Sequence, residues 1–134
     1  MLHIKPYIMK KTISKILGTM VILLLFTVSV QAQDKAAEGA KAVTNHMKEQ
    51  LSLNDSQYTK VYAVNLDFLK KAMENKNAGD KTKLEKAKRQ KALDEERDTK
   101  LESVLTKEQF RMFIANKAEN RKKLRAYFQD KTEE

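Results

Sequence analysis

The sequence predicts an all-α protein built from four helices. Apolar side chains recur at three- and four-residue steps along most of the chain after residue 32, which is typical of helices with one buried face. Good helix formers dominate this part of the chain, and the single proline, Pro6, lies ahead of it. No segment alternates apolar and polar residues with the β-branched enrichment expected of a strand.

The first 32 residues predict a secretory signal peptide. Residues 1–15 carry four lysines and no acidic residue, and residues 16–30 are an apolar run. Val30-Gln31-Ala32 follows, with small or medium-sized residues at the two positions that a signal peptidase recognises. We expect cleavage after Ala32. We also expect the signal peptide to begin at Met9-Lys10-Lys11, which is a typical opening of such a segment. An uncleaved membrane anchor is the alternative, but a spanning helix needs about 20 apolar residues and this run is shorter. The chain has no cysteine, which excludes a lipid-anchored signal and any disulfide.

Residues 33–134 are predicted to form a single all-helical domain. The leader holds four of the 27 basic residues and none of the 18 acidic ones, so this domain has 23 basic and 18 acidic side chains, a net charge of +5. Because the two signs are interspersed, this excess is modest for nucleic-acid binding, and we expect no nucleic-acid partner.

Periodicity places the four helices at about 36–51, from residue 55 to a turn at 75–80, at 81–104, and from residue 107 to about 128. The third segment has few apolar positions and sets charged residues beside them, namely Lys88, Lys91, Asp94, Arg97 and Asp98. The fourth has a stripe of Phe110, Phe113, Ile114, Ala118, Leu124 and Phe128, with Lys117 and Arg121 set into that face.

The second and fourth helices begin with the same pattern. Asn54 and Thr106 are predicted N-caps, and Gln57 and Gln109 follow three residues later, where each can close a capping box. A leucine precedes each cap and an aromatic residue follows, which predicts a hydrophobic staple at both helix starts; these residues are Leu53 with Tyr58, and Leu105 with Phe110.

These two segments resemble the Leu-Thr-x-x-Gln motif of the Spy/CpxP-like family of periplasmic proteins. Leu105-Thr106-Lys107-Glu108-Gln109 matches the motif, and Leu53-Asn54-Asp55-Ser56-Gln57 looks like a first copy in which asparagine replaces threonine. The resemblance covers about residues 51–128. It implies a long bent helical hairpin and a thin, cradle-like homodimer.

The resemblance also implies a function in the periplasm, which is where we expect the exported protein. Members of this family act as ATP-independent chaperones that hold unfolded or aggregation-prone clients, or as regulators of envelope-stress signalling. The expected partners are therefore unfolded or partly folded proteins, or one membrane sensor protein. A third hypothesis is a small structural, envelope-associated helical protein that binds anionic surfaces.

Candidate client-binding residues combine apolar and basic side chains at helical spacing. At such spacing, Met and Phe are more often core than client surface, and a single arginine is more often a solvated surface charge. The candidates are Met73, Arg89, Arg97, Arg111, Phe113, Arg121, Arg125 and Phe128.

No catalytic, cofactor-binding or metal-ligating set is predicted, so we expect a protein that is not an enzyme. His46 is the only histidine after the leader, and a nucleophile needs a positioned base beside it. Zinc sites use several His or Cys ligands. A metal site that uses His46 from each of two subunits stays open as an alternative.

Overall fold

The computed structural model describes residues 33–130, with side chains up to residue 126. The described chain is a bundle of four helices with no strand, so the predicted all-α fold is confirmed. They are the N-terminal helix (residues 33–51), α2 (Asp55–Asn77), α3 (Lys83–Val104) and α4 (Lys107–Asp130). The described residues from Asp34 onward form a compact unit of their own. The predicted signal peptide, residues 1–32, lies outside the described residues.

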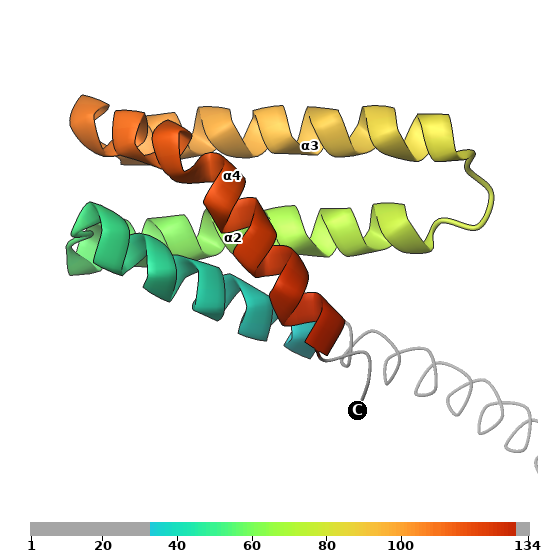
Figure 1. Cartoon of the computed structure of the whole chain (residues 1–134), viewed down its shortest axis with the longest axis horizontal. Coiled ribbons are helices and arrows are strands. Elements are labelled where there is room, and N and C mark those ends of the chain that lie inside the picture. Colours follow the sequence, from blue (N-terminus) through green and yellow to red (C-terminus); the bar gives the residue numbers. More distant parts are fainter. Residues whose placement is uncertain (1–32, 131–134) are drawn as a thin grey trace, which may run out of the picture. The chain divides into compact units, whose positions relative to one another are not determined.

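The α2 and α3 helices lie side by side and antiparallel as a hairpin, with the N-terminal helix along α2 (Figure 1). The α4 helix starts where α3 ends and crosses the hairpin obliquely (Figure 1). None of the described helices is both long enough and apolar enough to span a membrane. The cradle-like homodimer stays a prediction.

Both predicted capping boxes are present. At the start of α2, the Gln57 backbone N–H donates to Asn54 Oδ1 at 2.8 Å, and the Asn54 N–H donates to Gln57 Oε1 at 3.2 Å. At the start of α4, the Gln109 N–H donates to Thr106 Oγ1 at 3.2 Å, and the Thr106 N–H donates to Gln109 Oε1 at 3.0 Å. A third box, which the sequence analysis did not single out, joins Thr82 to Glu85 at the start of α3.

A tight turn folds the N-terminal helix back onto α2. Ser52 has a φ of 53°, in the left-handed region, and the Leu53 N–H donates to Lys48 O at 3.3 Å. This is the bonding pattern of a Schellman helix end, in which the residue after the left-handed one packs inward. Leu53 is accordingly buried, at 5% exposure.

The core forms two clusters along the bundle. One lies at the end that holds the two capping motifs and consists of Met47, Leu51, Leu53, Val61, Leu101, Leu105 and Phe113. The other lies farther along the hairpin and consists of Ala36, Ala40, Phe68, Leu69 and Leu93. Gly39 is buried within the N-terminal helix.

The buried face of α4 differs from the predicted stripe. Ile114 is 46% exposed and Ala118 is also exposed, whereas Asn120 is buried and Lys117 half-buried. The inner face therefore runs through Phe110, Phe113, Lys117, Asn120 and Leu124, a spacing of three and four residues that includes polar positions. The prediction for Ile114 and Ala118 is wrong because α4 is rotated to bring these polar residues inward.

Candidate functional site

The two motif glutamines bind each other across the bundle. Gln57 Nε2 donates to Gln109 Oε1 at 2.7 Å, and Gln109 Nε2 donates back to Gln57 Oε1 at 3.2 Å. Each amide group also donates to the last carbonyl of a helix. Gln109 Nε2 lies 3.1 Å from Leu51 O, at the end of the N-terminal helix, and Gln57 Nε2 lies 3.5 Å from Val104 O, at the end of α3. We call this reciprocal arrangement the glutamine clasp.

The clasp joins two helix corners that are far apart in the sequence. Gln57 belongs to the corner between the N-terminal helix and α2, and Gln109 to the corner between α3 and α4. Each side chain serves its own helix start as a cap and the other corner as a hydrogen-bonding partner. Since the four helix ends share these amide groups, the two motifs are one structural unit.

A buried arginine lies beyond the clasp, where all four helices meet. Arg97 of α3 is only 7% exposed. Its Nε donates to Asn65 Oδ1 of α2 at 2.9 Å, and its Nη2 lies 3.9 Å from Met47 Sδ of the N-terminal helix. The guanidinium carbon lies 5.0 Å from the ring centre of Phe68 and 5.6 Å from that of Phe113, which are cation–π distances.

The polar contacts continue from Arg97 into the N-terminal helix. Asn65 Nδ2 donates to Thr44 Oγ1 at 3.0 Å, and the Thr44 hydroxyl donates to Ala40 O at 2.6 Å. Asn65 is 1% exposed and Thr44 is fully buried. Asn65 therefore supplies the oxygen that Arg97 needs while its own amide hydrogens are satisfied elsewhere.

Arg97 carries its charge without a direct carboxylate partner among the described residues. Burial lowers the pKa of Arg97 to about 10, against an opposing effect of Asp98 and Asp94. The side chain is therefore charged at neutral pH, and its charge is balanced by an amide oxygen, a thioether and two aromatic rings. A charge buried in this way is costly to leave unpaired, so these partners are constrained.

Ion pairs on both sides of Arg97 attach α4 to α3. Arg121 Nη2 lies 2.9 Å from Asp94 Oδ2, and Lys117 is hydrogen-bonded to Asp98. These four residues are among the charged residues that interrupt the apolar stripes of α3 and α4 in the sequence. Pairing between the two helices explains their positions.

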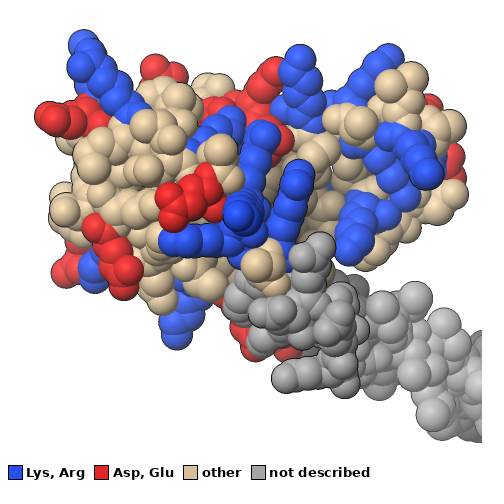
Figure 2. Space-filling model, in the orientation of Figure 1, with Lys and Arg blue, Asp and Glu red and all other residues tan. Residues whose placement is uncertain are grey.

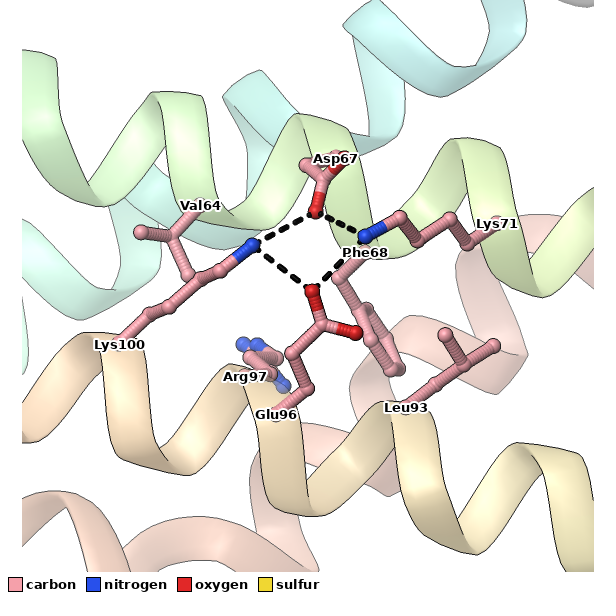
Figure 3. Close-up of a pocket in the computed structure, with 8 residues that line it drawn as sticks. All are labelled: Val64, Asp67, Phe68, Lys71, Leu93, Glu96, Arg97 and Lys100. Atoms are coloured by element: carbon pink, nitrogen blue, oxygen red, sulfur yellow. Dashed lines mark hydrogen bonds and ion pairs between the residues drawn. The ribbon is translucent and has the colours of Figure 1, made fainter.

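A second charged cluster bridges α2 and α3 on the surface (Figure 3). Lys71 Nζ lies 3.0 Å from Asp67 Oδ2 and 2.8 Å from Glu96 Oε1, and Lys100 Nζ lies 3.0 and 2.9 Å from the same two oxygens. Figure 3 shows the four side chains as a closed ring of alternating charge above Phe68 and Leu93. The depression that these side chains help to line has no room for a water molecule.

The ring shifts the pKa values of its members. Hydrogen bonds from Lys71 and Lys100 lower the pKa of the Asp67 carboxyl, and hydrogen bonds from Lys100 and Lys71 lower that of Glu96. Hydrogen bonds to Glu96 and Asp67 raise the pKa of both lysines in turn.

The structure separates the predicted client-binding residues into interior and surface groups. Arg97 and Phe113, at 7% and 0% exposure, are core residues and offer no contact surface to a client. Met73 is half-buried against the second core cluster. Arg89 is exposed on α3, and the side chain of Phe128 lies outside the described residues.

Three of the predicted residues share one exposed face of α4. Arg111, Arg121 and Arg125 are exposed, and Ile114 and Ala118 lie between them on the same side of the helix. We call these five residues the outer face of α4. Ile114 is 46% exposed, so this stripe is an apolar strip bordered by guanidinium groups.

The described residues contain no group of three His, Asp or Glu side chains that could hold a metal ion. His46 Nε2 lies 3.2 Å from Lys123 Nζ.

A family model described as "Domain of unknown function (DUF4890)" matches residues 29–113. The chain belongs to this family. The DUF4890 match includes both motifs and Arg97, and it ends in the first two turns of α4. No curated protein and no solved structure matches the chain.

Removing the acceptor of Arg97 tests the polar centre of this DUF4890 protein. We expect Asn65→Leu, which keeps the side-chain volume, to cost about 3 kcal/mol of unfolding free energy because Arg97 loses its oxygen partner. Adding Arg97→Met should recover at least about half of that loss, since no buried charge is then left unpaired. Urea unfolding measures both; a double variant that is less stable than Asn65→Leu alone would contradict the assignment.

The charged ring predicts a loss of stability in acid. The pKa values of Asp67 and Glu96 are lowered in the folded state. The contribution of these two carboxylates to the free energy of unfolding is therefore complete well above pH 4 and is lost as the pH falls below about 4. The variant Asp67→Asn/Glu96→Gln should therefore be less stable than the parent at pH 7, and the difference should shrink at pH values below about 4. Glu95→Gln/Glu102→Gln, with the same change in charge outside the ring, is the control. A difference that does not change with pH would refute the role of the ring.

Proposed function

We propose that this protein is an exported, ATP-independent chaperone-like protein that holds unfolded or aggregation-prone clients in the periplasm. The observation that supports the proposal is the outer face of α4. It combines exposed apolar side chains with three exposed arginines on one helix. The resemblance of both glutamine motifs to those of periplasmic chaperones supports the same function.

The chemistry of this face suits weak contact with many clients. Ile114 and Ala118 offer apolar surface to the side chains that an unfolded chain exposes. The arginines contribute planar guanidinium groups, which pair with carboxylates and stack on aromatic rings. Arg121 pairs with Asp94, whereas no described carboxylate forms an ion pair with Arg111 or Arg125.

The outer face does not by itself choose between many clients and one. A dedicated regulator of a membrane sensor would use the same strip for a single tight partner. The two functions differ in a measurable way, because only a general chaperone suppresses the aggregation of unrelated proteins.

Light scattering from chemically unfolded clients tests the proposal. The chain from Gln33 onward, added without ATP, should suppress the aggregation of two unrelated clients near stoichiometric ratio. Replacing Ile114 by Gln should raise the concentration needed for half suppression roughly fivefold, because the apolar centre of the strip is lost.

The matched control is Leu84→Gln, which removes an exposed aliphatic side chain from α3 and should leave suppression unchanged. Suppression that is insensitive to Ile114→Gln would exclude the outer face of α4 as the contact surface. Absence of suppression with both clients would refute the general-chaperone function and favour the dedicated regulator.

A further inference from the structure

The end of the α2–α3 hairpin extends beyond the core of the bundle (Figure 1). Asn75 is the last buried residue of α2, and Leu93 is the first buried residue of α3, so no described side chain between them is buried. Hydrogen bonds rather than apolar packing close this end: Asn75 Nδ2 donates to Lys86 O at 2.9 Å, and Lys86 Nζ donates to Lys76 O at 2.9 Å. We call residues 74–92 the hairpin tip.

One side of the hairpin tip is a leucine surrounded by lysines. Leu84, Lys88 and Lys91 follow one another at steps of four and three residues, which places them on a single side of α3, and Lys81 lies in the bend just before this helix. All four are exposed, and Leu84 has the largest exposure of the large apolar side chains, at 65%.

The positive charge of the hairpin tip is not balanced locally. The tip contains seven basic and three acidic residues. Glu85, its acidic residue nearest to Leu84, is engaged in capping α3. No described carboxylate forms an ion pair with Lys88 or Lys91. Figure 2 shows Lys and Arg side chains gathered over this end of the molecule, with few Asp and Glu side chains among them.

We propose that the hairpin tip docks on the surface of an anionic phospholipid bilayer. Leu84 enters the boundary between headgroups and acyl chains, while Lys81, Lys88 and Lys91 lie at the level of the lipid phosphates. This docking is independent of the chaperone function, because it uses α3 and leaves the outer face of α4 free.

The chemistry of the tip favours a membrane over an acidic protein. Lysines act as point charges that require no fixed geometry of the anion, whereas paired recognition of carboxylates in proteins favours arginine. The single protruding leucine lies at the end of a hairpin and not in a groove, so a soft and flat surface can accept it without a complementary shape. Exposed lysines around one apolar residue are the pattern of interfacial anchoring.

Cosedimentation with lipid vesicles tests this docking. The chain from Gln33 onward is mixed with vesicles of phosphatidylcholine alone, or with vesicles in which about a third of the lipid is phosphatidylglycerol. We expect binding to the anionic vesicles alone, weakening as salt is raised. The variant Lys81→Gln/Lys88→Gln/Lys91→Gln should bind roughly a hundredfold more weakly, at about fivefold per lysine.

Two further variants separate local docking from general charge attraction. Leu84→Ala should weaken binding roughly tenfold, with no change in its salt dependence. Lys41→Gln/Lys60→Gln/Lys107→Gln makes the same change in net charge at exposed sites outside the tip and should weaken binding less than about fivefold.

Equal losses from the two lysine triple variants would overturn the proposal, because binding would then follow net charge. Tip-dependent binding to polyglutamate without binding to anionic vesicles would also overturn it and would identify an acidic polypeptide as the partner. Since neither measurement uses an unfolded client, failure here leaves the chaperone test unaffected.

Discussion

The structure depends on the hydrogen bonds that Gln57 and Gln109 exchange. Each glutamine caps the helix that it begins, so its side chain is already fixed when it meets the other. The clasp thereby holds the corner between the N-terminal helix and α2 against the corner between α3 and α4. Phe113 follows Gln109 by one helical turn, and the clasp brings its ring over the buried guanidinium of Arg97. A short local motif, used twice, thus fixes a long-range arrangement of all four helices.

The rest of the bundle is held by polar contacts as much as by apolar packing. Arg97 occupies the centre with neutral partners, and ion pairs to Asp94 and Asp98 fasten α4 over it. Phe113, Lys117 and Asn120 lie on the inner side of α4, so Ile114 and Ala118 remain exposed. The apolar part of the strip proposed to hold clients is therefore left on the surface by the way α4 packs.

Local signals in the sequence predicted the helices and the starts of α2 and α4, because a cap acts within one turn. The clasp could not be predicted, since it joins amide groups 52 residues apart in the sequence. The rotation of α4 was missed for a related reason: its apolar residues border two faces, and contacts with the other helices, such as the pairing of Lys117 with Asp98 of α3, decide which face is buried. Arg97 was expected on a client-binding surface, yet it lies at the spacing of the buried Leu93 and Leu101. That spacing, with Asn65 set likewise between Val61 and Leu69, is the signal that could have revealed the polar centre.

The measurement that tests the clasp most directly is a double-mutant cycle between Gln57→Ala and Gln109→Ala, followed by urea unfolding of the chain from Gln33 onward. Each single variant loses its own cap, and the cycle isolates the energy that the two side chains share. The clasp predicts a coupling of about 1–2 kcal/mol, the value of two neutral hydrogen bonds in a partly buried site. Losses that add to within about 0.3 kcal/mol would show that the two motifs act independently and would contradict the account.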